Sequence, residues 1–443
     1  MAHKTIGLFL VVVGVGCATP QSKPVDARVD GLHFIEDDFP AALKLAQQTK
    51  RPLFVDTWAP WCHSCLALKE HVFTQGALAK YQDRFVFVAI NTELERSAAF
   101  LEKYPVENWP TLFVIDATSG AVALKWAGTG TVEQMEKLFL DGQRALANQA
   151  PDASAQALAQ ADRLYGEGKA LEAIAAYRAI LKDVPSTWER RPRAVESLLY
   201  ALFANREVGA CADLAVAEAT GLPKGPSFAN AVVWGLTCAS VIEGDEAKKK
   251  QVTAALEPMA QEALQLDGLL ADDRSGLYEL LVAVRSEQGD DKGARALAQE
   301  WLAFLENEAG KATTAGARAS FDPHRVGAAI ASGQPLRAVA ALELTEKEFP
   351  ADYNPAARLA LLYEAAGRYD EALTAIERAE TKVYGPRSIR IYEIKAGIFA
   401  KRGDQRAQRQ ALEKAVAFAK ALPVSQRPDK TVQRLEVELS KLP

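Results

Sequence analysis

The residues of this 443-residue chain best suited to chemistry are two cysteines three positions apart, Cys62 and Cys65. They follow an apolar run, residues 53–55, at the point where a helical pattern begins, which is the placement that dithiol–disulfide exchange needs. A Cys-x-x-Cys can equally be half of a zinc site, but that interpretation requires a second pair of ligands. The other cysteines are scattered and few histidines lie near the pair; these residues are Cys17, Cys211, Cys238, His63 and His71. We therefore interpret the pair as redox-active, and expect no metal site and no bound cofactor.

Around the two cysteines the sequence resembles the thioredoxin superfamily. Residues 53–62, Leu-Phe-Val-Asp-Thr-Trp-Ala-Pro-Trp-Cys, follow that family's pattern of a strand that leads into the active site. Residues 109–114, Trp-Pro-Thr-Leu-Phe-Val, match its cis-proline and the strand after it, and Gly120 and Gly128 match its hairpin and bend glycines. The resemblance covers residues 31–148 and implies an α/β thioredoxin-like fold. Within it, residues 56–91 are most similar to the thiol-reductase domains of bacterial envelope disulfide relays.

The resemblance implies catalytic roles for Cys62, Cys65, Asp56 and Pro110. A cysteine at a helix N-terminus has its thiolate stabilised by unpaired N–H groups and the helix dipole, which lowers its pKa from about 8.5 to roughly 3.5–7.5. We therefore expect Cys62 to attack and Cys65, one turn inside the helix, to resolve the mixed disulfide. In the family a carboxyl at the place of Asp56 takes up and delivers the proton of the resolving cysteine. Where the nearest thioredoxins carry a lysine beside this acid, Ala89 stands here, so proton transfer is slower or Asp56 stays protonated.

Four residues are predicted to contact substrate: Trp61, His63, Trp109 and Thr111. The dipeptide His63-Ser64 is neither the Gly-Pro of reducing thioredoxins nor the Gly-His or Pro-His of oxidants. A protonated His63 would stabilise the Cys62 thiolate and favour oxidant or isomerase behaviour, whereas a solvent-facing ring would do little. The direction of electron transfer stays open at this point. Trp109 either offers clients a large apolar surface or caps the sheet as a core residue.

The elements that must position these residues alternate between helix and strand and end in an antiparallel pair. Apolar spacing and breakers predict helix 39–49, strand 53–58, helix 62–80, strand 85–90, helix 93–104, strands 112–116 and 122–126, and helix 131–147. This is the order of a thioredoxin fold.

Length and composition set wider limits on the protein. A chain of 443 residues with 49% hydrophobic residues predicts two or three domains with sizeable cores. A net charge of -5 argues against a nucleic-acid partner. Five cysteines are too few for a disulfide-rich scaffold.

The N-terminus is typical of an export signal. The apolar run 6–15 is short for a bilayer span but suits a signal peptide, and residues 14–17, Gly-Val-Gly-Cys, resemble the bacterial lipobox. We predict a lipoprotein signal over residues 1–17, a lipid anchor at Cys17, and a polar tether over residues 18–30. The protein would then face the periplasm from a membrane. Cleavage after Ala18 would instead release a soluble periplasmic protein.

After a short polar linker, residues 149–153, the chain becomes rich in Ala, Leu, Glu, Lys and Arg. Segments 164–177 and 361–373 resemble each other and the tetratricopeptide pattern, in which two antiparallel helices interlock. Comparable turn points are Gly168, Asn205, Gly244, Gly289, Gly333, Gly367 and Gly403. Residues 154–443 are therefore predicted to form an all-α, tetratricopeptide-like solenoid that binds partners in a concave groove. Cys211 and Cys238 are either two isolated buried cysteines or a structural disulfide.

Together these features predict an envelope thiol–disulfide oxidoreductase that acts on protein cysteines, with a helical repeat domain for partner binding. Its partners would be client proteins with cysteines or disulfides, an upstream envelope redox partner, and the membrane through the Cys17 lipid. The rival from another class is a non-catalytic adaptor whose thioredoxin fold serves as a docking module.

Overall fold

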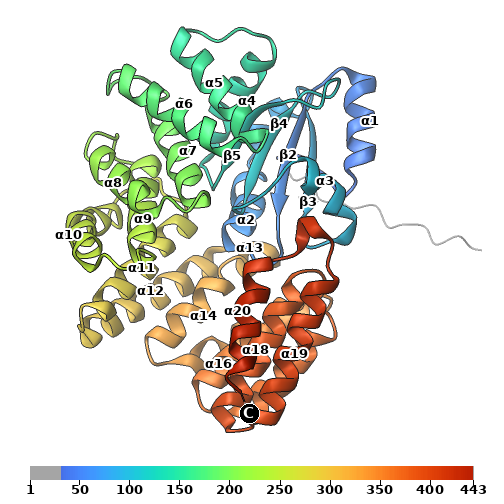
Figure 1. Ribbon diagram of the computed structural model, residues 1–443, viewed down its shortest axis with the longest axis vertical. Coiled ribbons are helices and arrows are strands. Elements are labelled where there is room, and N and C mark those ends of the chain that lie inside the picture. The colour runs from blue at the N-terminus through green and yellow to red at the C-terminus, as the bar shows by residue number, and fades with distance from the viewer. Residues whose placement is uncertain (1–30, 443) are drawn as a thin grey trace, which may run out of the picture.

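The computed structural model describes residues 31–442, which form a thioredoxin-like domain and a long helical array (Figure 1). The predicted signal segment 1–17, the anchor at Cys17 and the tether 18–30 lie outside the described residues. Between residues 31 and 442, no helix has both the length and the apolar character needed to cross a bilayer.

A five-stranded mixed sheet forms the centre of the first domain. Its strands are β1 (Ile35–Glu36), β2 (Leu53–Trp58), β3 (Val86–Asn91), β4 (Thr111–Ile115) and β5 (Val122–Ala127). Their spatial order is β1-β3-β2-β4-β5. Strands β1, β3 and β2 are parallel to one another, and β4 runs antiparallel to both of its neighbours, β2 and β5. The register of β2 places Asp56 opposite Ala89, as the sequence predicts.

Side chains alternate between the two faces of β2 because successive residues of a strand point in opposite directions. Phe54 packs in one apolar core with Phe87 and Phe139, and Leu53 and Val55 pack in another on the opposite side. The helices and helical turns that accompany the sheet are α1 (Phe39–Thr49), α2 (His63–Ala67), η1 (Leu68–Val72), η2 (Gly76–Tyr81), η3 (Glu95–Ser97), α3 (Ala98–Lys103) and α4 (Val132–Leu146).

The helix predicted over residues 62–80 is interrupted. The α-helical part ends at Ala67, a π-helical turn continues to Val72, and a separate 3-10 helix begins at Gly76. The Phe73 carbonyl accepts a hydrogen bond of 2.8 Å from the N–H of Leu32 rather than from a later helical turn. This contact with a distant segment explains the break, which local helical spacing could not show.

The second domain is a series of helical hairpins. Its helices are α5 (Ala153–Gly166), α6 (Ala170–Asp183), α7 (Arg191–Ala204), α8 (Val208–Ala219), α9 (Pro226–Ser240), α10 (Glu246–Ala263), α11 (Ala271–Glu287), α12 (Asp291–Lys311), α13 (Ala315–Ala319), α14 (Asp322–Ala331), α15 (Val339–Glu348), α16 (Asn354–Ala365), α17 (Tyr369–Glu380), α18 (Arg387–Arg402), α19 (Gln405–Ala421) and α20 (Asp429–Ser440), with 3-10 turns η4 (Pro335–Ala338) and η5 (Val424–Gln426). The predicted turn points all fall between helices. Gly168 and Gly367, for example, have φ values of 75° and 74°, a backbone conformation that favours glycine. A disulfide joins Cys211 of α8 to Cys238 of α9, which settles the alternative that the sequence leaves open.

The array curves around the thioredoxin-like domain and contacts it along most of its length (Figure 1). Asn354 of α16 donates a hydrogen bond to the Pro60 carbonyl just before the cysteines. Gln426 of η5 donates to the carbonyls of Thr92 and Leu94. Near the other end of the array, a Cβ on Gly128 would lie 1.7 Å from the Tyr200 hydroxyl oxygen, so only glycine permits this approach. The inner face of the array therefore holds the chain's own first domain, whereas the sequence predicts a groove for other proteins.

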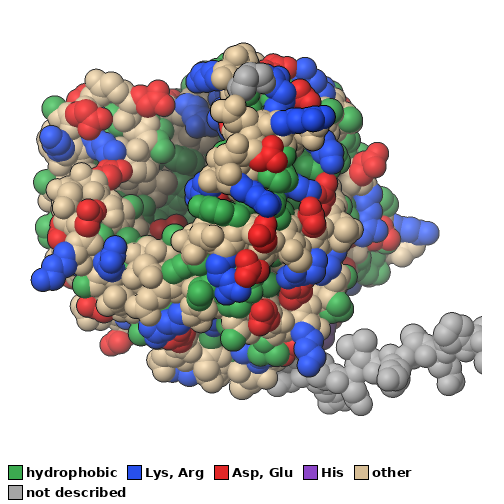
Figure 2. Space-filling model, turned by 90° about the horizontal axis from the view of Figure 1, so that it is seen from below, with side chains coloured by type: hydrophobic (Ala, Val, Ile, Leu, Met, Phe, Trp, Pro, Cys, Tyr) green, Lys and Arg blue, Asp and Glu red, His purple; other side chains and the backbone are tan. Residues whose placement is uncertain are grey.

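Charges on the outer surface are mixed. Figure 2 shows basic and acidic side chains interspersed over one face, without a large area of one sign. This agrees with the small net charge of -5.

Candidate active site

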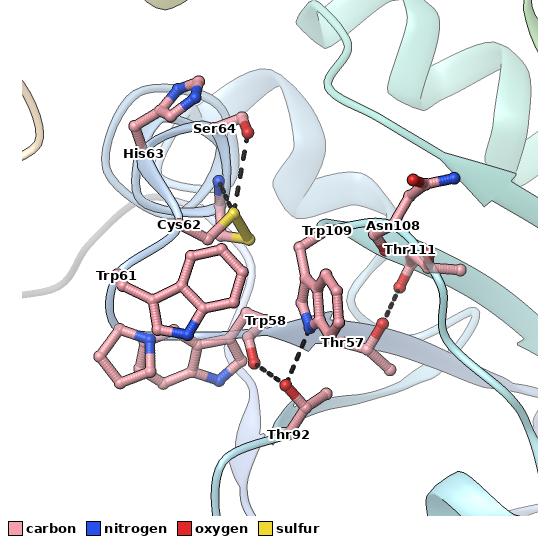
Figure 3. The surroundings of a disulfide bond; sticks show 12 residues. Thr57, Trp58, Trp61, Cys62, His63, Ser64, Thr92, Asn108, Trp109 and Thr111 are labelled. Atoms are coloured by element: carbon pink, nitrogen blue, oxygen red, sulfur yellow. Dashed lines mark hydrogen bonds between the residues drawn. A yellow bond between two sulfur atoms is a disulfide. The ribbon is translucent and has the colours of Figure 1, made fainter. Parts of the chain in front are cut away.

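The two motif cysteines form a disulfide at the N-terminus of α2 (Figure 3). Cys62 is the N-cap residue, and its Sγ accepts a hydrogen bond of 3.1 Å from the N–H of Cys65. In the reduced protein the same N–H group and the helix dipole would favour a thiolate at Cys62. Both residues are buried, with 4% and 2% of their surface exposed.

Trp61 and Trp109, together with Trp58, pack against the disulfide. Trp109 precedes Pro110 in a cis peptide bond, and its ring meets that of Trp61 edge to face, with 5.4 Å between the ring centroids. The Trp109 indole N–H donates a hydrogen bond of 2.8 Å to the Thr92 hydroxyl (Figure 3). Trp109 thus joins a small apolar cluster with the cysteines at the end of the sheet.

The helical domain fixes the Trp61 ring. The Trp61 indole N–H donates a hydrogen bond of 2.9 Å to Glu93 Oε1, and the Arg387 guanidinium of α18 lies 4.9 Å from the Trp61 ring centroid. The Arg387 backbone N–H donates to the other oxygen of Glu93 over 2.6 Å. Burial raises the pKa of Glu93, and the hydrogen bond from Trp61 and the Arg387 contacts oppose that rise. No sequence pattern singles out Glu93 or Arg387, because the contact forms only when the two domains meet.

Asp56 is a buried carboxyl in β2, with 4% of its surface exposed. Burial raises its pKa to about 7, and Lys69 opposes the rise. Its Oδ1 has no hydrogen-bond partner, which favours the protonated acid at neutral pH and below. Lys69 of η1 pairs with Glu36 over 3.3 Å and lies over the Trp58 ring.

His63 points away from the two tryptophans (Figure 3) and toward the helical domain. Its Nδ1 lies 2.8 Å from Asp272 Oδ1 in α11 and 3.0 Å from His324 Nε2 in α14. Burial lowers the pKa of His63, but the Asp272 carboxylate outweighs it, so the pKa is raised overall. Burial would raise the pKa of Asp272, yet the neighbouring imidazoles hold it well below its usual range. The His63 side chain thus does not line the cleft, and its ring contacts the helical domain while remaining partly exposed.

A cleft of about 1090 Å³ opens beside the tryptophans, between the first domain and the C-terminal helices. Trp61 and Trp109 form one wall, and the other walls come from α3, the first turns of α18 and the segment around η5. Thr111 does not line it: the residue is 1% exposed, and its hydroxyl donates to the Asn108 carbonyl over 2.6 Å. Of the four predicted substrate contacts, the structure therefore brings Trp61 and Trp109 to the cleft.

Comparison with known proteins agrees with the fold of the first domain. Residues 35–117 match the family described as thioredoxin-like. A solved tetratricopeptide repeat protein from Parabacteroides merdae ATCC 43184 is similar at 13% identity and a TM-score of 0.42, covering 65% of this chain and 98% of that one. No curated protein matches the chain. The described residues form a thioredoxin-like domain with a cysteine pair, joined to a series of helical hairpins.

Proposed function

We propose that the protein is a thiol–disulfide oxidoreductase of the bacterial cell envelope that exchanges disulfides with cysteine-containing client proteins. The observation that carries the proposal is the Cys62–Cys65 disulfide at a helix N-terminus, packed against Trp61 and Trp109 beside an open cleft. A disulfide used only for stability would not need that surrounding. The thioredoxin-like match over residues 35–117 supports the same chemistry.

Each turnover transfers two electrons between the pair and a client. In the reducing direction the Cys62 thiolate attacks a client disulfide, forms a mixed disulfide and releases one client thiolate. Cys65 then loses its proton and attacks the Cys62 sulfur; Asp56 is the buried group able to take up that proton in the molecules where it is ionised, since its pKa is about 7. The second client thiolate leaves, the Cys62–Cys65 disulfide remains, and an upstream dithiol partner must reduce it again. The oxidising direction runs the same steps in reverse.

The cleft beside Trp61 and Trp109 is the proposed client site. It begins at the two aromatic rings that cover the disulfide, and it is large enough for an extended peptide. Because Cys62 is only 4% exposed, a client sulfur reaches it only when a covering side chain moves. The helical domain contributes one wall of this cleft, which gives it a part in client selection.

The burial of the cysteine pair also favours a second candidate, a non-turning-over adaptor. In that case the first domain fills the inner face of the array as a structural module, and partners bind the outer surface. The two candidates differ in whether Cys62 can be trapped on a client.

Trapping with resolving-cysteine variants distinguishes them. Cys65→Ser in the full chain should accumulate mixed disulfides with envelope proteins through Cys62, and Cys62→Ser should accumulate none. A matched control is the double variant Cys211→Ser with Cys238→Ser on the wild-type pair, which should still exchange disulfides. If Cys62→Ser exchanges disulfides as fast as wild type, or Cys65→Ser traps nothing, the adaptor is the better account.

The proposed location is the periplasmic side of a membrane, with Cys17 as the lipid-bearing residue. The support is the lipobox resemblance of residues 14–17. Fatty-acid labelling in a Gram-negative host should mark the wild-type chain and not Cys17→Ala, which should also leave the membrane fraction. A wild-type protein found wholly in the soluble periplasm would favour cleavage after Ala18 instead.

A further inference from the structure

Three side chains from two domains meet next to the cysteine motif. His63 begins α2, Asp272 lies in the first turn of α11, and His324 lies in the first turn of α14. Asp272 Oδ1 is 2.8 Å from His63 Nδ1 and 3.1 Å from His324 Nε2, and the two nitrogens are 3.0 Å apart. One carboxylate oxygen and two imidazole nitrogens thus form a small triangle.

Hydrogen bonds alone do not satisfy this triangle. If both nitrogens carry protons that point at Asp272 Oδ1, the two N–H groups converge on one oxygen and their hydrogens lie close together, because the nitrogens are only 3.0 Å apart. If only one nitrogen carries a proton, the lone pair of the other faces the carboxylate oxygen at 2.8 Å or 3.1 Å. With Asp272 ionised, each of these proton distributions leaves one unfavourable contact in the triangle, whereas a cation at the centre would attract all three atoms.

We propose that His63, Asp272 and His324 bind one divalent transition-metal ion, for which zinc is the best fit. Two imidazole nitrogens and one carboxylate oxygen are a ligand set that zinc uses together with a water molecule. Bonds of about 2.0–2.1 Å in a tetrahedral site place ligand atoms roughly 3.3 Å apart. The distances of 2.8–3.1 Å are slightly shorter, so a small outward movement of the side chains accommodates the ion.

The surroundings of the triangle suit a metal site. Asp272 and His324 are 7% and 3% exposed on their side chains, while His63 is 42% exposed and leaves a side open for water. The second ring nitrogen of His324 faces Glu279 Oε2 at 3.7 Å. A carboxylate on the far nitrogen of a ligating histidine orients the ring and strengthens it as a ligand.

Bound zinc would fasten the cysteine motif to the helical domain, because His63 lies between Cys62 and Cys65 while the other two ligands lie in α11 and α14. The two cysteines themselves are not ligands. The site is therefore independent of the proposed thiol exchange, and either could fail without the other.

Zinc binding to the full-length, oxidised chain tests the site. Free thiols are first blocked with iodoacetamide, and zinc chloride alone is the probe, followed by calorimetry and metal analysis after dialysis. The wild type should bind one zinc per chain, and Asp272→Asn and His324→Gln should each weaken binding by at least about 100-fold, beyond the roughly 10–100-fold of an outer-shell change. Glu279→Gln, which changes an exposed side chain, should weaken it by about 10-fold.

His71→Gln is the matched control, because His71 lies at the same domain interface and contacts Ser320 over 2.9 Å. The zinc affinity of His71→Gln should lie within about threefold of the wild-type affinity. Excess zinc should raise the melting temperature of both proteins, because it binds their folded states. Circular dichroism checks that each variant is folded. Wild-type protein that binds no zinc overturns the proposal, as does zinc that binds equally well to Glu279→Gln, Asp272→Asn and His324→Gln.

Discussion

The two disulfides within residues 31–442 differ in their structural surroundings. Cys62 and Cys65 are three residues apart, at the start of one helix, packed against three tryptophan rings and beside a large cleft. Cys211 and Cys238 are 27 residues apart, within two packed helices, and each is 0% exposed. The first pair has a helix N-terminus that stabilises a thiolate, and the second has only an apolar core. Backbone surroundings rather than burial alone separate a disulfide suited to exchange from one suited to bracing.

The largest expected difference between the two pairs is in activity. Cys62→Ser should lower the rate of exchange with a protein disulfide to the uncatalysed background, because no attacking thiolate remains. Cys238→Ser should leave the rate within about twofold of wild type, since its sulfur takes no part in the proposed steps. The exchange rates of both variants can be measured with a fluorescent disulfide-linked peptide in assays quenched at fixed times. Similar losses in the two variants would remove the distinction.

A pH-dependent stability difference is expected from Asp56, which lies in the first domain. Its folded pKa of about 7 exceeds the ordinary value of 3.8, so the folded state binds the proton more tightly. Stability from this group is complete below pH 4 and is lost as the pH rises through 7, by on the order of 4 kcal/mol. Relative to Asp56→Asn, the wild type should therefore lose unfolding free energy between pH 4 and 7. Urea unfolding at a series of pH values measures this difference. If the unfolding free energies of the two proteins change in parallel with pH, Asp56 is ionised in the folded state.

The Cys211–Cys238 disulfide of the helical array should contribute to stability rather than to activity. Opening a 27-residue loop by Cys238→Ser is expected to lower the free energy of unfolding by about 3–4 kcal/mol, chiefly through the entropy of the unfolded chain. Cys211→Ser should give the same loss, and the double variant no more than either alone. Denaturant unfolding followed by circular dichroism measures it. Losses that add in the double variant would mean that the two sulfurs are not bonded to each other.

The smallest expected effect concerns the wall that the array adds to the client cleft. Arg387→Ala removes the cation beside the Trp61 ring, a contact of about 0.5–1 kcal/mol, and should raise KM for a protein client by about two- to fivefold. kcat should change little. Arg390→Ala, on the same cleft wall, is the control for loss of charge without loss of the ring contact. An equal rise in both variants would assign the effect to charge.

Sequence patterns predict features of this molecule that depend on neighbouring residues. The turn at Gly168 is confirmed because a left-handed glycine acts over a few positions. The register of Asp56 against Ala89, which joins two separate strands, is confirmed because the family resemblance supplied it. The break after Val72 was not predicted, because it depends on Leu32. The meeting of Asp272 and His324 with His63 likewise requires the curvature of the whole array, which no local spacing encodes.

The spacing of Cys211 and Cys238 could not decide between a disulfide and two free thiols. The two residues lie near the start of one helix and the end of the next, and their bond depends on how the α8–α9 hairpin packs. Helix periodicity places both side chains on buried faces but does not give the distance between them.

Reduction of the native protein in graded redox buffers tests the central claim most directly. Differential alkylation and mass spectrometry would follow each cysteine pair separately as the buffer potential is lowered. We predict that Cys62–Cys65 is reduced with a midpoint between about -270 and -120 mV, the range of exchange-active dithiols. Cys211–Cys238 should stay oxidised until below about -300 mV, as structural disulfides do. If Cys62–Cys65 stays oxidised until the protein unfolds, or the two pairs are reduced together, the first pair is also structural and the oxidoreductase account is contradicted.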